Sequence, residues 1–291
     1  MQIIKIKPQS FCKGVANAIH ILNIAMHKNN LSTPIYMLGG IVHNNHIINA
    51  YKNMGIIIVD SLDNLDPHGT LIITAHGISN KKRQEINDLG LNIIDTTCSE
   101  VEKIQVRVND KIKSGYDVIY YGIAKHAECQ AIMEDNPTVH LIQSIEDVSK
   151  LNIKNNLIYF CSQTTMSYLS VVQIEESIKN RYSTCYFDHN VCTATKDRQE
   201  ALIENAKICD LIIVVGDKTS NNTNNLKKIA AKYTDTIMIN SIDEARHINL
   251  SGINILGITS GASTPALLVD EIIKTLNDPS YLSIIQDKNY I

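Results

Sequence analysis

Short apolar runs alternate along the chain with segments in which apolar residues recur every three or four positions. The run Leu211 to Val215 is of the first kind, and the segment Val15 to Ala25 is of the second. Short runs rich in β-branched residues are typical of strands buried in a parallel sheet, whereas a spacing near 3.6 is typical of helices packed on such a sheet. The pattern therefore predicts βα units around parallel sheets, which is the α/β fold class.

The same succession of elements occurs three times. In each third, a cysteine follows an apolar stretch and precedes a helix-like segment, and these cysteines are Cys12, Cys98 and Cys192. The repeat length of roughly 90 residues suits a domain and is too long for a solenoid repeat. We therefore expect three α/β lobes, over residues 1–97, 98–191 and 192–291. If a pseudo-threefold axis relates the lobes, the three cysteines face one central cavity.

Polar loops follow the predicted strands and precede predicted helices in every third. They contain His43, His76, His126, Thr164, Thr165, Ser220, Asn221, Asn222 and Ser263. Ligands of α/β proteins bind beyond the carboxyl ends of the strands, and exposed N–H groups at helix N-termini favour anions. Phosphate or diphosphate therefore fits this set of small donors and imidazoles. Taken singly, each loop also fits a plain helix N-cap, the commoner role of Ser, Thr and Asn.

The composition limits the partners and the location of the protein. The chain has 291 residues, 44% of them hydrophobic, and a net charge of -3, which gives no electrostatic case for binding nucleic acid or an anionic membrane. No apolar run reaches the roughly 20 residues of a membrane-spanning helix, and we expect no signal peptide. Seven cysteines, an odd number, suit a reducing cytoplasm, where thiols are available for metal binding or chemistry.

The cysteines divide into two groups. Four lie in or beside apolar segments and are expected to be free thiols of the core: Cys129, Cys161, Cys185 and Cys209. The other three, converging from three lobes, would bind zinc or an iron–sulfur cluster. Structural zinc sites normally show paired ligands such as C-x2-C, and the chain has no such pair. We therefore favour an iron–sulfur cluster with three protein ligands and a fourth iron open to a substrate oxygen.

Motifs along nearly the whole chain carry a family resemblance. They are Phe11-Cys12-Lys13-Gly14-Val15, Ala75-His76-Gly77, Asp95-Thr96-Thr97-Cys98, His126-Ala127-Glu128, Gln163-Thr164-Thr165, Cys192-Thr193-Ala194-Thr195 with Arg198-Gln199-Glu200-Ala201, and Gly261-Ala262-Ser263. In this order they closely resemble the motifs of the 4-hydroxy-3-methylbut-2-enyl diphosphate reductases. That family catalyses the last step of the methylerythritol phosphate route to isoprenoids.

The resemblance implies a trefoil of three α/β lobes around a 4Fe-4S cluster, with Cys12, Cys98 and Cys192 as its ligands. It implies that Glu128 supplies protons, with His126 and Thr164 as further catalytic residues. The substrate would be bound by side chains from all three lobes, namely His43, His76, His126, Thr164, Thr165, Ser220, Asn221, Asn222 and Ser263. Its diphosphate would be held by His43, His76, His126, Ser220, Asn222 and Ser263. The reaction would take two electrons and two protons, release water, and give isopentenyl and dimethylallyl diphosphates.

The electrons would come from a separate carrier of the ferredoxin or flavodoxin type, since the chain has no G-x-G-x-x-G or other nucleotide-binding fingerprint. Five positions depart from the usual family residues, and these are Asn17, Ser99, Lys125, Ala127 and Asn221. They leave two alternatives from other classes. One is a cluster-bearing redox sensor or other non-catalytic paralogue, for which Glu128 and Thr164 would be unnecessary. The other is a protein without a cluster that binds a phosphorylated metabolite.

Overall fold

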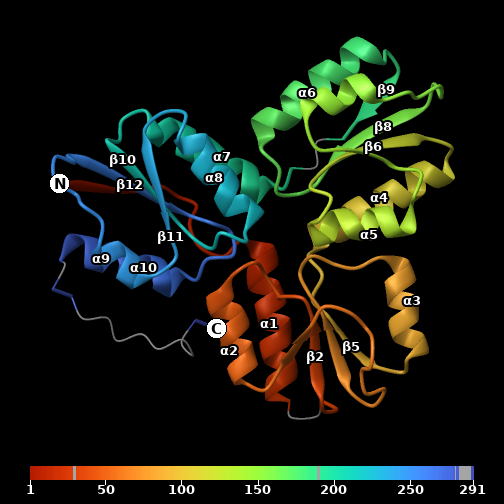
Figure 1. The fold of residues 1–291 in the computed structure, drawn as a ribbon, viewed down its shortest axis with the longest axis horizontal. Coiled ribbons are helices and arrows are strands. Elements are labelled where there is room, and N and C mark those ends of the chain that lie inside the picture. Colours follow the sequence, from red (N-terminus) through yellow and green to blue (C-terminus); the bar gives the residue numbers. More distant parts are fainter. Residues whose placement is uncertain (29–30, 189–190, 279, 282–289) are drawn as a thin grey trace.

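Three four-stranded sheets, all with parallel strand pairs, form the three lobes of the protein (Figure 1). The computed structural model describes residues 1–28, 31–188, 191–278, 280–281 and 290–291. The predicted α/β class and the three lobes are confirmed. None of the helices in the described ranges is long and apolar enough to cross a membrane.

The first lobe has the strand order β3-β2-β4-β5. Its strands are β2 (Ile35–Leu38), β3 (Ile57–Val59), β4 (Thr70–Ile73) and β5 (Asn92–Asp95). Its helices are α1 (Lys13–His27), α2 (Asn45–Asn53) and α3 (Asn80–Asp88). Apolar residues of α1 and α2 pack on one face of the sheet, and Ile86 of α3 packs on the other, so β4 is buried along its whole length.

The second lobe repeats this order as β7-β6-β8-β9. Its strands are β6 (Asp117–Tyr121), β7 (His140–Ile142), β8 (Ile158–Ser162) and β9 (Cys185–Phe187). Its helices are α4 (Ser99–Lys113), α5 (Ala127–Asp135), the 3-10 helix Ile145–Lys150 and α6 (Tyr168–Arg181). Every residue of β8 is buried, because α4 and α5 cover one face of the sheet and α6 covers the other.

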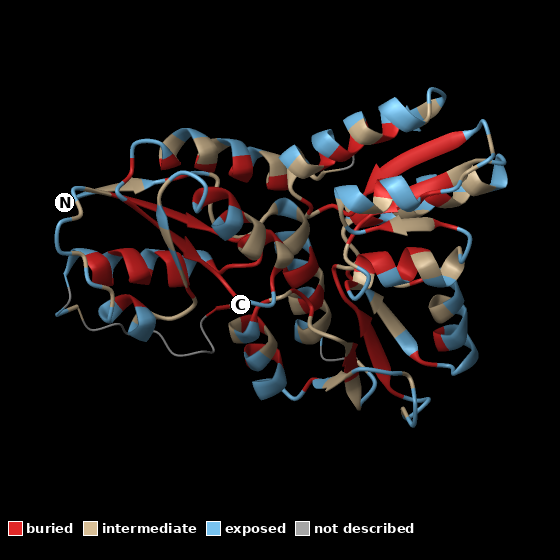
Figure 2. Ribbon diagram, turned by 45° about the horizontal axis from the view of Figure 1, so that its top comes forward, coloured by how far each residue is buried: buried red, intermediate tan, exposed pale blue. Residues whose placement is uncertain are grey.

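The third lobe has the order β11-β10-β12-β1. Its strands are β10 (Leu211–Val215), β11 (Asp235–Ile239), β12 (Ile255–Ser260) and the N-terminal β1 (Gln2–Lys5). Its helices are α7 (Thr193–Ala206), α8 (Asn221–Ala230), α9 (Ile242–Arg246) and α10 (Ala266–Asn277). Figure 2 shows the consequence for the core, which is that the central strands of the sheets are buried while the outer faces of the helices are exposed.

The strand β1 corrects the predicted range 1–97 for the first lobe. It pairs with β12 in the third sheet, with Ile4 opposite Gly257. It thereby takes the edge position that β5 and β9 occupy in the other two sheets. The physical reason is that the described residues of the third part of the chain supply only three strands, so the edge of β12 would otherwise leave its backbone groups unpaired. The chain therefore closes into a ring of lobes.

Gly257 lies in β12 between the two neighbouring strands, where the packing leaves no room for a side chain. A Cβ atom there would collide with Cδ1 of Ile212 and would lie 2.8 Å from Sγ of Cys209 and 3.1 Å from Cδ1 of Ile6. We predict that Gly257→Ala lowers the free energy of unfolding by about 1–3 kcal/mol, the usual cost of overpacking a core. Denaturant unfolding followed by circular dichroism measures this change.

The exposed Lys228 on α8 provides the control for this substitution. Lys228→Ala should change the free energy of unfolding by no more than about 0.5 kcal/mol, because surface substitutions away from special features have small effects. A Gly257→Ala variant as stable as this control would contradict the packing described for β12.

Candidate active site

Each repeat cysteine stands at a junction between lobes. It follows the edge strand of one lobe and is the N-cap residue of the first helix of the next, which is α1, α4 or α7. The backbone N–H of each cysteine donates to a carbonyl in the loop after a central strand. The pairs are Cys12 with Ala262, Cys98 with Ala75 and Cys192 with Thr164, at 3.0, 3.0 and 3.1 Å between nitrogen and oxygen. This bond recurs in all three thirds, so the repeat itself brings the cysteines to equivalent positions.

Gly14 lies beside the thiols of Cys12 and Cys98. A Cβ atom on Gly14 would be 2.5 Å from Sγ of Cys98 and 3.9 Å from Sγ of Cys12, so only glycine leaves both thiols their space. Burial raises the pKa of the Cys98 and Cys192 thiols, and negative charge at Cys12 raises both pKa values further. A positively charged group or a metal would offset that cost, because metal binding requires thiolates.

The three thiols do not converge on a single ion. Within the described part of the chain, the one set of three His, Cys, Asp or Glu residues whose ligand atoms lie within 4.8 Å of one another is His43, His76 and His126. The three thiols line one cavity but are farther apart than the ligands of a single metal ion would be. This spacing fits a larger group that contains several metal ions. The thiols therefore suit a polynuclear iron–sulfur cluster better than a mononuclear zinc site.

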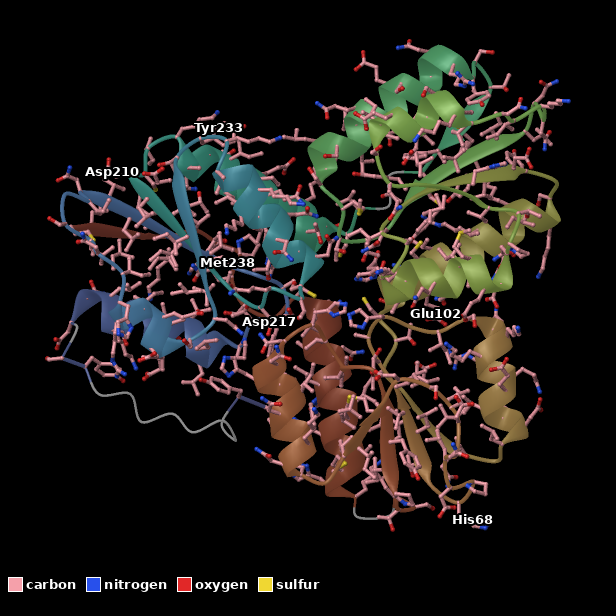
Figure 3. All side chains as sticks on the ribbon, in the orientation of Figure 1. His68, Glu102, Asp210, Asp217, Tyr233 and Met238 are labelled. Atoms are coloured by element: carbon pink, nitrogen blue, oxygen red, sulfur yellow. The ribbon has the colours of Figure 1, made fainter. Side chains whose placement is uncertain are left out.

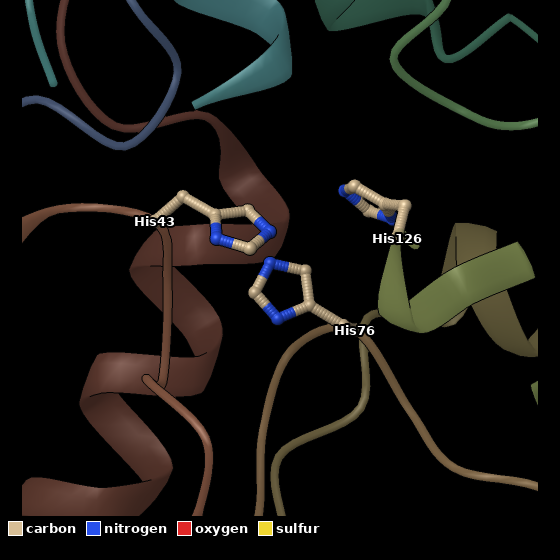
Figure 4. Close-up of side chains that lie close together, drawn as sticks. All are labelled: His43, His76 and His126. Atoms are coloured by element: carbon tan, nitrogen blue, oxygen red, sulfur yellow. The ribbon is translucent and has the colours of Figure 1, made fainter. Parts of the chain in front are cut away.

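The three histidines come from two lobes and face one another (Figure 4). The ring centroids of His43 and His76 are 4.2 Å apart, and His126 lies 5.1 and 5.6 Å from them. Burial lowers the pKa of His43 and of His126 to about 4 and holds that of His76 well below its usual range. All three imidazoles are therefore neutral at pH 7. Each then offers one N–H donor to a ligand.

His126 also shows which of its nitrogens is available. It is the N-cap residue of α5, and its Nδ1 accepts a hydrogen bond from the backbone N–H of Glu128 at 3.3 Å. An accepting Nδ1 in a neutral ring assigns the proton to Nε2. The cap therefore fixes the tautomer and leaves Nε2–H as the donor.

Glu128 is a buried carboxyl group that Thr164, in the loop after β8, holds in place. Its side chain is 4% exposed. The hydroxyl of Thr164 donates to both carboxyl oxygens, at 2.8 and 2.9 Å, and the Thr164 N–H donates to one of them at 3.1 Å. Burial raises the pKa of Glu128, and the hydrogen bonds from Thr164 only partly counteract this. The carboxyl group thus retains its proton to a higher pH than an exposed glutamate does.

The third lobe adds small polar side chains. Ser220 is the N-cap residue of α8, and the Ser263 hydroxyl donates to the His43 carbonyl at 3.0 Å. Among the residues that the structure describes, neither polar side-chain atom of Asn222 has a partner, and nor does Nε2 of His43, although all three atoms are buried. Buried polar atoms are nearly always hydrogen-bonded, so these orphaned groups indicate the position of a polar ligand.

Asn221 and Thr165 bind each other across the second and third lobes. The Asn221 amide donates to the Thr165 carbonyl at 3.0 Å and to its hydroxyl at 3.1 Å. Because these bonds already occupy the amide group, the geometry gives both residues a role in joining the lobes, beside the ligand contacts that the sequence predicts for them.

All of the predicted site residues line one cavity at the junction of the lobes. The sequence reasoning missed Val15, Val42 and Thr195, which line it too. Val42 is apolar and carries no signal of a site, whereas Val15 lies inside the Cys12 motif. Thr195 lies inside the Cys192 motif, which could have pointed to it.

Asp217, a residue that the sequence analysis also missed, fastens the first lobe to the third (Figure 3). Its carboxylate accepts from the Asn45 N–H at 2.9 Å and from the Asn240 amide at 3.2 Å. The signal that could have found it is an acidic residue directly after the glycine that follows β10.

Comparison with known proteins identifies the family. A profile described as "LytB protein" matches residues 3–277. The chain belongs to the LytB family. Two similar relatives, from Halalkalibacterium halodurans and Bacillus subtilis, are both named 4-hydroxy-3-methylbut-2-enyl diphosphate reductase. The first is 37% identical over 290 residues, covering 96% of this chain and 92% of the relative, and the second is 38% identical over 293 residues, covering 96% and 93%.

Solved structures of the family share the fold. The structure titled as the E-1-hydroxy-2-methyl-but-2-enyl-4-diphosphate reductase from Plasmodium falciparum has a TM-score of 0.90 and 30% identity, covering 99% of this chain and 89% of that one. A second structure, titled as (E)-4-hydroxy-3-methyl-but-2-enyl diphosphate reductase, has a TM-score of 0.69 and 26% identity, covering 95% and 99%. The trefoil predicted from the family resemblance is therefore confirmed.

The departures from the usual family residues lie mostly away from the cavity of this LytB protein. Asn17, Ser99 and Lys125 are exposed, and neither they nor Ala127 lines it. Asn221 alone among the five lines the cavity, where it joins two lobes. The cavity of this chain thus keeps its thiols, its histidines and its carboxyl group.

The neutral histidines predict a pH dependence of stability. The pKa of His43 and of His126 is about 4 in the folded protein, against an ordinary 6.5. Protons therefore bind the unfolded chain more readily, so the stabilisation by these residues is complete above about pH 6.5 and is lost as pH falls towards 4. We predict that the free energy of unfolding of metal-free protein falls across this window. Denaturant titrations between pH 7 and 4.5 measure it.

The comparison that isolates the histidines is a His43→Gln, His126→Gln double variant. Carboxyl groups titrate in both proteins, so a difference between the two profiles of unfolding free energy against pH is due to the imidazoles. The double variant should lose less stability on acidification than the unchanged protein does. Parallel profiles would show that neither imidazole is held neutral by burial.

Proposed function

We propose that this protein is a 4-hydroxy-3-methylbut-2-enyl diphosphate reductase, which produces isopentenyl and dimethylallyl diphosphates. The observation that carries the proposal is the cavity itself. It combines three thiols, three neutral imidazoles and one buried carboxyl group. Thiols alone would serve a redox sensor, and imidazoles alone would serve a phosphate-binding protein. The buried Glu128 with its Thr164 partner favours catalysis, because neither alternative requires a proton donor.

The family implies an iron–sulfur cofactor, and we assign it as one 4Fe-4S cluster held by Cys12, Cys98 and Cys192. When bound, it would supply electrons one at a time and an iron that acts as a Lewis acid towards the substrate hydroxyl. The polypeptide contributes the shape of the site. Gly14 gives the thiols room, and the bonds from the cysteine N–H groups fix their backbones.

The diphosphate would bind where neutral donors gather. His43, His76 and His126 would donate through N–H groups, and Ser220, Asn222 and Ser263 would add hydroxyl and amide donors. The N-termini of α5 and α8 lie at the same cavity, and a helix N-terminus favours an anion. Binding would raise the pKa of the imidazoles, since a nearby negative charge favours their cationic form. The substrate would thus supply the negative charge that these neutral donors bind.

Glu128 would deliver the proton that the departing hydroxyl needs. Hydroxide is a poor leaving group, so protonation of its oxygen assists cleavage of the C–O bond. Two electrons and two protons convert the alcohol into a C–H bond and water, one proton going to oxygen and one to carbon. Thr164 would hold both carboxyl oxygens in place during this transfer.

The electrons would arrive from an external one-electron carrier of the ferredoxin or flavodoxin type. We assign no role to nucleic acid or to a membrane. Turnover tests the whole proposal. Protein purified and reconstituted without oxygen should reduce the hydroxy diphosphate to both products when an artificial one-electron reductant is supplied. Cluster-loaded protein that leaves the substrate unchanged would refute the assigned activity.

The cysteine assignment predicts two classes of variant. Cys12→Ser, Cys98→Ser or Cys192→Ser should each lose most of the bound iron and lower turnover by at least about 100-fold, because even residues that only support metal ligands often cost 10- to 100-fold. Iron and sulfide assays after anaerobic reconstitution measure this loss. The matched controls are Cys129→Ala, Cys161→Ala and Cys209→Ala, which alter buried thiols outside the cavity and should retain the iron.

The proton assignment predicts a loss of rate. Glu128→Gln keeps the size of the side chain and can still bond Thr164, but it has no carboxyl proton to give. We predict that kcat falls by about 100-fold or more, the usual scale of general acid catalysis. The unchanged protein should lose activity as pH rises through the raised pKa of Glu128, and this limb of the pH profile should be missing in the variant.

Asn222→Ala is the contrasting variant for the same steady-state assay. It removes donors to the anion, so KM should rise by about 10- to 100-fold while kcat changes little. Glu128→Gln protein with the kcat of the unchanged protein would overturn the proton assignment and leave the binding assignment standing.

A further inference from the structure

Arg198 on α7 is a buried guanidinium between two of the cysteine segments. It is 2% exposed. Its NH1 donates to the Ala194 carbonyl and its NH2 to the Ser10 carbonyl, both at 2.7 Å. Ala194 comes two residues after Cys192, and Ser10 comes two residues before Cys12. One side chain thus holds together the two chain segments that carry these cysteines.

The charge of this guanidinium has no carboxylate partner in the described part of the chain. Its two bonded partners are neutral carbonyls, and its Nε is buried without a partner. Burial lowers the pKa of Arg198, and the negative charges that oppose this effect are those of Cys12, Cys192 and the exposed Asp197, in that order. Burying a cation without an opposite charge is costly, and negative charge at the two cysteines would offset that cost.

The neighbouring residue, Gln199, also joins two chain segments, but its side chain is uncharged. Gln199 is 1% exposed, accepts from the Tyr168 N–H at 2.8 Å and donates to the Met166 carbonyl at 3.1 Å. These bonds fasten α7 to the loop after Thr164 and Thr165. An uncharged side chain therefore suffices to join α7 to the second lobe. Arg198, by contrast, carries a positive charge that interacts with Cys12 and Cys192.

We propose that Arg198 is the fixed counter-charge of the cysteine site and stabilises the cluster in its reduced form. The inference rests on the proposed function, because it presumes that the three thiolates hold a cluster. A cluster gains negative charge when it takes up an electron, and a nearby buried cation favours that change. Arg198 is then a positioning residue that sets the reduction potential and does not contact the substrate.

The test compares Arg198→Met, Arg198→Lys and Lys196→Met with the unchanged protein. Lys196→Met is the matched control, since it removes a positive charge from the same helix where the side chain is 39% exposed and lies near Glu200. Each protein is reconstituted anaerobically. Its midpoint potential is then measured by dye-mediated redox titration, and its iron loss is followed during challenge with a chelator.

We expect Arg198→Met to have a more negative midpoint potential and to lose iron faster than the unchanged protein. Arg198→Lys and Lys196→Met should keep potentials close to that of the unchanged protein, because the first retains the buried charge and the second removes only an exposed one. A purely structural role for Arg198 would alter thermal stability in the Met and Lys variants alike and would leave the potential unmoved.

The outcomes separate this inference from the proposed function. In one outcome, the unchanged protein binds iron and turns over while Arg198→Met has the same midpoint potential. That result would overturn only the counter-charge role of Arg198. Unchanged protein that binds no iron overturns the cluster and this inference together. If Arg198→Met takes up no iron, then Arg198→Lys decides. A folded Lys variant with iron and an unshifted potential supports the charge, and a folded Lys variant without iron shows that the carbonyl contacts matter instead.

Discussion

The parallel pairing of β1 with β12 is the interaction on which the rest of the structure depends. It carries the N-terminal segment along the third lobe, and further bonds continue it towards Cys12. The Gln9 amide donates to the Ile258 carbonyl, and the Ser10 N–H donates to the Ser260 hydroxyl, both at 2.6 Å. The Cys12 N–H then donates to a carbonyl in the loop after β12, as the Cys98 and Cys192 N–H groups do to the loops after β4 and β8. The chain thus closes into a ring, and the third cysteine reaches the common cavity.

Two opposing electrostatic effects act on the cysteines of that cavity. Their positions at helix N-caps favour thiolates, because a helix N-terminus carries a partial positive charge. Burial and mutual repulsion raise the pKa of Cys98 and Cys192 and oppose this preference. The proposed metal cluster and the buried Arg198 would shift the balance to the thiolates. Burial likewise keeps the three histidines neutral, and the negative charge of the proposed diphosphate would raise their pKa.

Much of the fold and of the cavity lining can be predicted from the sequence, because the same order of strands, helices and polar loops occurs three times. Polar residues that follow apolar runs in each third predict the carboxyl ends of strands, and the cavity collects all of them. The ring closure is not readable, because the predicted lobe boundaries follow chain order while β1 pairs with a strand some 250 residues away. The burial of Asp217, and of Arg198 within the quoted Cys192 motif, is not readable for another reason. A charged residue on a helix or loop is normally exposed, and only the tertiary structure buries these two between lobes.

The central claim is that three cysteines from three lobes hold one cluster whose fourth iron has no protein ligand. Mössbauer spectroscopy of protein reconstituted anaerobically with iron-57 tests it most directly. The account predicts one iron site distinguishable from the other three, whose signal alone changes strongly when the hydroxy diphosphate is added. Four equivalent irons that ignore the substrate, or a single mononuclear iron, would contradict it.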